Sequence, residues 1–264
     1  MSLNEPQVMG ILNVTPDSFY ASSRVQTEKD VAERAHQIVN EGGSIIDIGA
    51  CSTRPDSTPV SEEEEMARLR MALGVVRREL PKAVVSVDTF RPKVARMAVE
   101  ELGADIINDV GAPATTHHSP LSANMLRMVS RLRVPYILMS SEPTLRDTLL
   151  FFAEQVQRLR DMGHNDIILD PGFGFGKTLE QNYALMAELE KLQVMELPIL
   201  VGISRKSMIY KLLGITPDDA LNGSTALHAV ALMKGASILR VHDVKEAVEV
   251  GRMMEELECI ASRG

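Results

Sequence analysis

Eight short apolar runs recur along the chain, and amphipathic stretches separate them. Most of the runs are apolar at successive positions, which is typical of strands buried on both faces of a parallel sheet. The runs cover residues 7–13, 44–49, 83–88, 104–110, 134–139, 166–170, 198–203 and 236–241. Strict alternation of strand and helix through eight repeats favours a closed (β/α)8 TIM barrel over an open doubly wound sheet.

The intervening stretches are predicted to be helices, and six of these helices can be given bounds. Residues 27–43 begin at Thr27 and end at two glycines, and residues 61–80 begin at Ser61 with Glu64 three positions later, as in a capping box. The other four span residues 148–163, 178–192, 222–235 and 244–257. We expect residues 1–264 to form one barrel domain, because such barrels ordinarily use about 250 residues and no linker divides the chain.

Charge and cysteine content argue against several classes of protein. The net charge is −8 at pH 7, whereas a general nucleic-acid binder normally has a basic face. No apolar run reaches the roughly 18 residues of a membrane helix, and the first residues lack the basic and apolar regions of a signal peptide. Two cysteines, Cys51 and Cys259, make no disulfide framework, so we expect a reducing cytoplasm.

Polar residues gather where six of the predicted strands end. In a TIM barrel the active site lies at this end, because it is built from strand termini and the loops that follow them. One polar residue at a strand end is readily explained as a cap or a turn, but six on one rim predict a site. The six are Asn13, Asp47, Asp88, Asn108, Asp170 and Arg240.

The residue types at this rim indicate what it binds. Carboxylates and amides suit a flat heterocycle, because a carboxylate accepts parallel hydrogen bonds from an amino group and a neighbouring ring N–H. Cations and hydroxyls occur nearby in STRP (52–55), SRKS (204–207) and RVHD (240–243). Arginines such as Arg54 and Arg205 suit phosphate or carboxylate. We therefore expect an acidic floor for a heterocycle and a basic rim for anions.

Seven motifs, in order and spanning nearly the whole chain, resemble those of the dihydropteroate synthase family. They are MGILNVTPDSF (9–19), IIDIGACSTRP (45–55), VSVDT (85–89), INDV (107–110), ILDPGFGFGK (168–177), VGISRKSMI (201–209) and RVHDV (240–244). The resemblance implies a (β/α)8 transferase of folate synthesis that joins a dihydropterin pyrophosphate to p-aminobenzoate and releases pyrophosphate. It also implies Mg²⁺, inhibition by sulfonamides, and a homodimer formed through the last helices.

The resemblance also assigns roles to matching residues. It implies that the pterin contacts Asp88, Asn108, Met139, Asp170 and Lys206, and that p-aminobenzoate contacts Thr53, Arg54, Pro55 and Ser207. It implies that pyrophosphate contacts Asn13, Arg54, Arg240 and His242, and that Asn13 offers an oxygen to Mg²⁺. The catalytic set is then Asp88, Asp170, Lys206 and Arg240.

The same resemblance identifies two loops, and it also shows where this sequence departs from the family pattern. The family's mobile loops correspond to about residues 14–25, where a lid would contain Asp17 and Phe19, and 50–60. In the second loop, Ala50, Cys51 and Asp56 replace Gly, Glu and Gly. After the fifth strand, the usual MHM reads MSS, with Ser140 and Ser141. Both departures border the p-aminobenzoate pocket and the pterin edge.

Two alternative functions stay open at this level. A pterin methyltransferase domain shares the acidic floor but has no use for the cationic segments 52–55 and 240–243. A non-catalytic pterin-binding barrel does not need the intact polar set at the strand ends. In the last predicted helix, Met253 and Met254 either contribute to a dimer interface or pack in the core, and we expect core packing.

Overall fold

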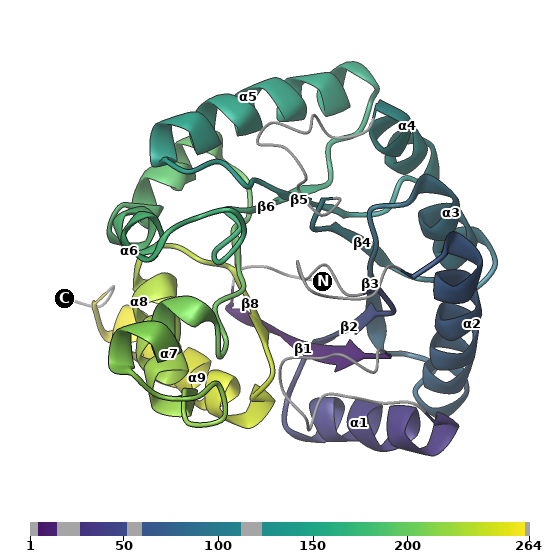
Figure 1. Cartoon of the computed structure of the whole chain (residues 1–264), viewed down its shortest axis with the longest axis horizontal. Helices are drawn as coiled ribbons and strands as arrows, with labels where there is room; N and C mark the ends of the chain where they lie inside the picture. The colour runs from purple at the N-terminus through teal and green to yellow at the C-terminus, as the bar shows by residue number, and fades with distance from the viewer. Residues whose placement is uncertain (1–4, 15–26, 52–59, 112–122, 262–264) are drawn as a thin grey trace.

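The computed structural model describes residues 5–14, 27–51, 60–111 and 123–261, and they form a barrel of parallel strands surrounded by helices (Figure 1). Neighbouring strands follow the order β6-β5-β4-β3-β2-β1-β8-β7, and a parallel bridge between Leu169 and Ile199 connects the β6 and β7 edges. The predicted (β/α)8 architecture is therefore confirmed. The strands are β1 (Gln7–Asn13), β2 (Ile45–Gly49), β3 (Val84–Asp88), β4 (Ile106–Asp109), β5 (Tyr136–Met139), β6 (Ile167–Asp170), β7 (Leu200–Val201) and β8 (Ile238–Val241).

The six predicted helices are present in the structure. They are α1 (Glu28–Asn40), α2 (Glu62–Glu79), α5 (Leu145–Asp161), α6 (Leu179–Ala187), α8 (Leu221–Met233) and α9 (Val244–Ala261). The predicted helix 178–192 is divided in the structure into α6 and the 3-10 helix η2 (Leu189–Met195), so its predicted end was wrong. Further helices whose bounds were not predicted are α3 (Pro92–Glu100), α4 (Ala123–Leu132) and α7 (Ser207–Leu213). Each of these three is at most 10 residues long, so its sequence has too few turns to show a clear period.

Local capping chemistry decides where the predicted helices begin. Thr27 and Asp30 form the complete capping box of α1. The Ser61 hydroxyl accepts from the Glu64 amide at 3.1 Å, but the Glu64 carboxylate pairs with Arg68 instead of closing the box. Helix α5 begins before the predicted Thr148, because Thr144 is the residue that caps it.

The barrel interior is apolar at its amino-terminal end. Every strand except β3 contributes one side chain to a separate buried cluster, and Val84 of β3 packs against it. This layer separates the polar end of the barrel from its base. Its members are Met9, Ile45, Ile106, Ile137, Ile168, Leu200 and Ile238.

Two residues further along each strand, the interior becomes polar. Side chains alternate across a strand, so the residue two positions beyond each member of the apolar layer also faces inward. On six strands these positions hold Asp47, Ser86, Asn108, Met139, Asp170 and Arg240. The change from apolar to polar inside one barrel places most of the predicted rim residues around a common centre.

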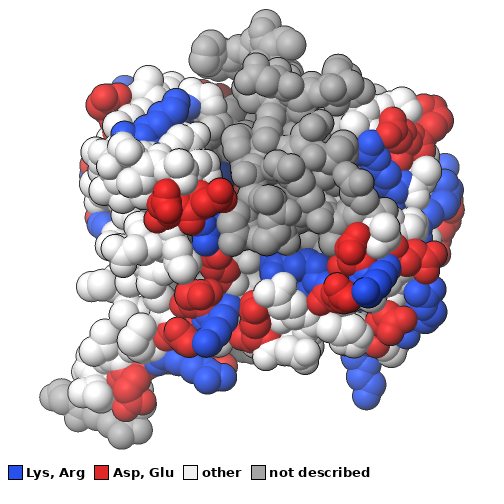
Figure 2. All heavy atoms as spheres, turned by 60° about the horizontal axis from the view of Figure 1, so that its bottom comes forward, with Lys and Arg blue, Asp and Glu red and all other residues white. Residues whose placement is uncertain are grey.

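The outer surface carries mixed charge and one correction to the sequence prediction. Figure 2 shows acidic and basic side chains interspersed on the face that it presents. Met254 packs against the core as predicted, but the prediction is wrong for Met253, which is 56% exposed. No helix in the described part of the chain is long and apolar enough to cross a membrane. That residues 1–264 form a single domain stays a prediction.

Ile137→Ala tests the apolar layer, because Ile137 is fully buried within it. We expect the substitution to lower the free energy of unfolding by about 2–5 kcal/mol, the usual result of opening a cavity in a packed core. Urea denaturation measures the change. The matched control is Leu150→Ala, since Leu150 is 61% exposed and its loss should cost less than about 0.5 kcal/mol. Equal losses in the two variants would contradict a packed barrel interior.

Candidate active site

Nine of the predicted site residues lie at or just after the carboxyl ends of the strands. The residues that end strands are Asn13, Asp88, Met139 and Asp170, and those one position before the end are Asn108 and Arg240. The residues that follow β7 and β8 are Lys206, Ser207 and His242. The predicted p-aminobenzoate residues Thr53, Arg54 and Pro55 lie outside the described residues, as do Asp17, Phe19 and Asp56.

Arg240 joins two carboxylates inside the barrel. Its Nε lies 2.7 Å from Asp47 Oδ2, and its Nη2 lies 2.9 Å from Asp88 Oδ2. Asp47 Oδ2 also accepts a hydrogen bond from Asn108 Nδ2 at 3.2 Å. The sequence placed Asp47 on the rim as one carboxylate of the acidic floor but gave it no individual role. In the structure Asp47 is fully buried, and it fixes the orientation of both Arg240 and Asn108.

Burial and mutual charge determine the protonation of this cluster. Burial raises the pKa of Asp88 above its ordinary range, Arg240 opposes the shift, and Asp47 adds to it. Burial disfavours the charged form of Arg240, but the charges of Asp47 and Asp88 outweigh that effect and raise its pKa. Arg240 therefore remains a cation and keeps the two carboxylates together.

Lys206 and Asp170 are oppositely charged residues that influence each other electrostatically beside this cluster. Burial raises the pKa of Asp170, and the charge of Lys206 is the strongest opposing influence. Burial lowers the pKa of Lys206 to about 8, which Asp170 opposes. Lys206 Nζ donates to the Phe173 carbonyl at 2.6 Å and lies 4.6 Å from the centre of the Phe175 ring. An ammonium proton donor and a carboxylate acceptor thus face the same space.

Three buried oxygens of the inward-facing layer have no hydrogen-bond partner in the described part of the chain. They are Asp47 Oδ1, Ser86 Oγ and Asn108 Oδ1. The amide orientation of Asn108 is required by chemistry, because its nitrogen must be the atom that donates to the Asp47 carboxylate. A buried acceptor without a donor is costly. The arrangement is therefore suited to a ligand that brings several N–H groups into the barrel.

The loop after β6 is held closely against the end of β5. Gly172 has a φ of 67°, and a Cβ at this position would lie 2.0 Å from the Ser140 carbonyl oxygen. The Lys177 ammonium donates to the carbonyls of Ser140 at 3.2 Å and Gly172 at 3.0 Å. Burial lowers the pKa of Lys177 to about 8. The loop that carries Phe175 is thereby fixed relative to the strand ends.

The sequence predicted that Arg205 contributes to the basic rim for anions, and this prediction was wrong. Its side chain is 5% exposed and forms a two-pronged ion pair with Asp243, with Nε–Oδ2 at 2.8 Å and Nη2–Oδ1 at 2.9 Å. Its Nη1 donates to the Pro217 carbonyl at 3.0 Å. Arg205 therefore connects the loop after β7 to the loop after β8, and it holds Lys206 near Arg240.

His242 lies beside Arg240 as a neutral imidazole. Arg34 Nη2 donates to the His242 carbonyl at 2.7 Å, and the His242 amide donates to Ser204 Oγ at 3.2 Å. Burial lowers the pKa of His242 to about 3, and the charge of Arg240 adds to the shift. His242 can therefore donate a hydrogen bond to an anion near neutral pH without carrying a charge.

The donor set at the end of β1 fits magnesium only together with a phosphate. Among the described residues, no group of three or more His, Cys, Asp or Glu side chains could hold a metal ion. Mg²⁺ commonly takes one or two protein oxygens and completes its shell with water and substrate phosphates. Asn13 Oδ1 is an oxygen of this kind, lying beside Gly49, where a Cβ would approach it to 2.9 Å.

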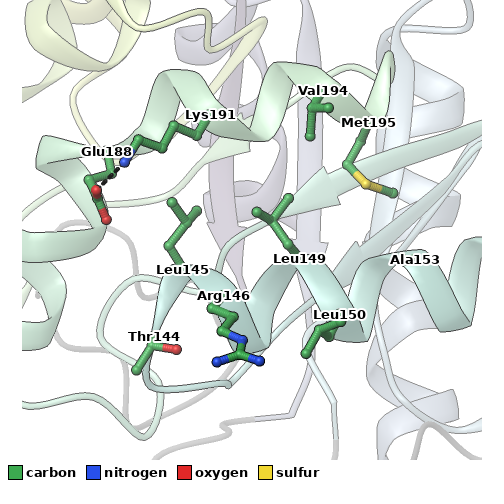
Figure 3. Close-up of a pocket in the computed structure, with 10 residues that line it drawn as sticks. All are labelled: Thr144, Leu145, Arg146, Leu149, Leu150, Ala153, Glu188, Lys191, Val194 and Met195. Carbon is green, nitrogen blue, oxygen red and sulfur yellow. Dashed lines mark hydrogen bonds and ion pairs between the residues drawn. The ribbon is translucent and has the colours of Figure 1, made fainter.

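A surface pocket lies elsewhere, between α5 and η2. Figure 3 shows Leu145 and Leu149 of α5 pointing toward η2, which carries Val194 and Met195. None of the predicted site residues lines this pocket. The convergent polar side chains lie in the barrel, so we place the candidate active site there.

Three comparisons relate the chain to known proteins. A family model described as a pterin binding enzyme matches residues 9–242. The dihydropteroate synthase of Escherichia coli strain K12 is 39% identical over 263 residues, covering 97% of this chain and 93% of that protein.

Two solved structures are also similar to the chain. A Yersinia pestis dihydropteroate synthase in complex with a sulfonamide drug has a TM-score of 0.88 at 36% identity, covering 98% of this chain and 96% of that one. A Xanthomonas albilineans dihydropteroate synthase with 4-aminobenzoic acid has a TM-score of 0.84 at 36% identity, covering 98% and 95%.

Arg240→Met tests the buried ion pairs. We expect the free energy of unfolding to fall by about 3 kcal/mol or more near neutral pH, because the substitution leaves two buried carboxylates without their cation. Arg240 lowers the pKa of Asp88, so its loss raises that pKa further above the unfolded value of about 3.9. The folded state then binds more protons than the unfolded state between these two values, so stability falls as pH rises through this window.

Urea denaturation at about pH 7.5 and about pH 5.5 measures the effect, and the loss relative to wild type should be smaller at the lower pH. The control is Glu101→Gln, which removes an exposed ion pair with Arg70 and should cost at most about 1 kcal/mol. The same loss for Arg240→Met at both pH values would contradict the assigned electrostatics.

Proposed function

The chain belongs to the dihydropteroate synthase family of pterin-binding enzymes, and we propose that the polar end of its barrel performs that family's reaction. It is a transferase that condenses 6-hydroxymethyl-7,8-dihydropterin pyrophosphate with p-aminobenzoate to give 7,8-dihydropteroate and pyrophosphate. The observation that carries this assignment of the site is the pair of buried acceptors, Asp47 Oδ1 and Asn108 Oδ1, beside the charged side chains of the barrel interior.

The pterin ring supplies the donors and acceptors that this space lacks. Its amino group and neighbouring ring N–H donate to the Asp170 carboxylate, whose Oδ1 also accepts from the Gly172 amide at 2.8 Å. Asn108 Oδ1 accepts a further ring N–H, and the Lys206 ammonium donates to a ring acceptor. Met139, which is 7% exposed, lies against the ring face. Asp88 completes the acidic surroundings of the ring.

The leaving group takes the cationic side of the mouth. Arg240 and His242 donate to the pyrophosphate oxygens, Arg240 as a cation and His242 as a neutral N–H. Asn13 offers its amide oxygen to Mg²⁺, and Arg54 is a further pyrophosphate residue by resemblance. When bound, Mg²⁺ neutralises charge on the pyrophosphate and so makes it a better leaving group.

The chemistry needs positioning and electrostatics more than a strong base. The bond between the pterin CH₂ and the pyrophosphate oxygen breaks, and its electron pair leaves with the oxygen. The arylamine nitrogen of p-aminobenzoate forms the new bond to the CH₂ and then loses a proton to solvent. The carboxylates of Asp47 and Asp88 stabilise the positive charge that develops on the pterin and its CH₂. Lys206 and Asp170 hold the ring in place.

The p-aminobenzoate side is formed by two segments. Ser207 follows Lys206 after β7 and is partly buried, and Thr53, Arg54 and Pro55 belong to the segment between β2 and α2. We propose that sulfonamides, which resemble p-aminobenzoate, occupy the same place, as supported by the Yersinia pestis relative that binds one. Of the positions that depart from the family pattern, Ala50 and Ser140 are fully buried.

A pterin methyltransferase is less well supported. It shares the acidic floor, but it leaves no role for Arg240 and His242 as pyrophosphate ligands. Nucleic acid is not proposed as a partner, because the net charge is −8.

We also propose a homodimer and a cytoplasmic location. The dimer is supported by apolar side chains, each more than half exposed, on three helices that lie together in Figure 1: Leu212 and Leu213 of α7, Met233 of α8, and Met253, Leu257 and Ile260 of α9. The cytoplasmic location is supported by Cys51 and Cys259, which are not joined in a disulfide. Sedimentation equilibrium tests the dimer.

Release of pyrophosphate tests the function itself. The protein is mixed with dihydropterin pyrophosphate, p-aminobenzoate and Mg²⁺, and pyrophosphate and dihydropteroate are measured together. We expect equal amounts of both products, and neither product when p-aminobenzoate is left out. Absence of dihydropteroate from the complete mixture would contradict the proposal.

Asp170→Asn tests the pterin site. We expect pterin binding to weaken by about 2 kcal/mol or more, because a charge-assisted pair becomes an amide that must also donate. Calorimetry with a pterin ligand measures the change. The control is Asp161→Asn, at the exposed end of α5, where the carboxylate accepts from Gln157. Unchanged affinity in Asp170→Asn would remove Asp170 from the site.

The pH dependence of kcat/KM tests Lys206. Its pKa of about 8 means that the charge is present below that pH and is lost above it. Because kcat/KM reports groups of the free enzyme, the value for the pterin substrate should fall above about pH 8. Lys206→Arg should move this decline to higher pH, since arginine stays charged. Lys177→Arg is the control, since the pKa of Lys177 is also about 8, and a decline that followed Lys177 instead would contradict the role of Lys206.

A further inference from the structure

Arginines hold both ends of the segment that connects β2 to α2. At the first end, Arg68 of α2 donates from Nη1 to the Ala50 carbonyl at 3.2 Å and pairs with Glu64 on its own helix. At the second end, Arg91 donates from Nη2 to the Val60 carbonyl at 2.6 Å. The two arginines thus fix the points where the segment leaves β2 and where it approaches α2.

The second end has the more extensive network. Arg91 Nη1 donates to the Ser61 carbonyl at 3.3 Å and pairs with Glu65 Oε2. Glu65 Oε1 accepts from the Thr89 hydroxyl at 2.7 Å. One guanidinium therefore contacts two backbone carbonyls of the segment and a carboxylate of α2 at the same time.

Glu65 lies on the buried side of α2, where a charged side chain is unusual. Its side chain is fully buried, whereas the Arg91 side chain is 21% exposed. Burial raises the pKa of Glu65, and the hydrogen bond from Thr89 and the charge of Arg91 oppose that shift. A buried ion pair contributes little net stability compared with apolar side chains of similar volume. This pair is therefore better explained by the position that it imposes than by stability.

The network is built on the strand that carries part of the pterin site. Thr89 directly follows Asp88, and its amide donates to the Asn108 carbonyl at 3.0 Å. The opposite end of the segment is also near, because the Val60 backbone forms a hydrogen bond with the Cys51 side chain. Arg91 and Glu65 thus connect the base of the segment to the ends of β3 and β4.

We propose that Arg91 and Glu65 are positioning residues for p-aminobenzoate. They fix Val60 and Ser61, which follow the segment that contains Thr53, Arg54 and Pro55, relative to Asp88 and Asn108. Neither residue contacts a substrate itself. This inference rests on the proposed function, which assigns that segment to p-aminobenzoate.

The test is a comparison of KM values for the two substrates. The double variant Glu65→Gln with Arg91→Met removes the ion pair without leaving a buried charge, and the Thr89 hydroxyl can still donate to the new amide. We expect KM for p-aminobenzoate to rise at least tenfold, and KM for dihydropterin pyrophosphate and the Kd of a pterin to change less than threefold. Arg70→Met is the matched control. Arg70 lies on α2, the helix of Glu65, and it pairs with Glu101 on the surface.

Arg91→Lys is the second variant, and it keeps the charge next to Glu65. A single ammonium cannot reproduce the several contacts of the guanidinium fork, so KM for p-aminobenzoate should rise about threefold to tenfold. If the double variant does not fold, Arg91→Lys decides alone. Unchanged KM for p-aminobenzoate, or equal rises in KM for both substrates, would overturn the inference. The proposed function would still stand, because the wild type would be active. A wild type that forms no dihydropteroate would instead overturn the proposed function.

Discussion

The Arg240 guanidinium between Asp47 and Asp88 is the interaction on which the candidate site depends. Two carboxylates cannot remain charged side by side in a buried space without a cation, and Arg240 supplies that cation from β8 at 2.7 Å and 2.9 Å. In the barrel β8 lies beside β1, and its Arg240 reaches Asp47 of β2 and Asp88 of β3. The apolar layer formed by residues such as Ile45 and Ile238 lies beneath it. The charge cluster therefore depends on the fold.

Contacts between loops keep the remaining groups in place around this cluster. Arg205 connects the loops after β7 and β8 through Asp243, and Lys177 holds the loop after β6 against the end of β5. Electrostatic stabilisation of a developing charge is effective only when the charged groups are fixed before the reaction begins. Lys206 and Arg240 both have a strong preference for water. The buried contacts between loops hold them in place inside the barrel.

The sequence predicts the barrel and most of the rim, because both follow from local patterns. Apolar runs of strand length mark the eight strands, and the polar residues at or near the ends of six runs, such as Asp88 and Asp170, mark the functional end of the barrel. The prediction that Arg205 binds an anion was wrong because its partners, Asp243 and the Pro217 carbonyl, lie 38 and 12 residues away in the sequence. No local pattern encodes such contacts, and the same limit explains why Asp47 was given no individual role. Helix α7 was missed because it has only 7 residues.

The most direct test of the central claim is a crystal structure with a dihydropterin ligand and Mg²⁺-pyrophosphate. The account predicts the ring inside the barrel mouth, with its N–H groups within hydrogen-bond distance of Asp170 and Asn108 Oδ1, Lys206 Nζ on a ring acceptor, and pyrophosphate on Arg240 and His242. A ring bound outside the barrel, for example in the pocket between α5 and η2, would contradict it.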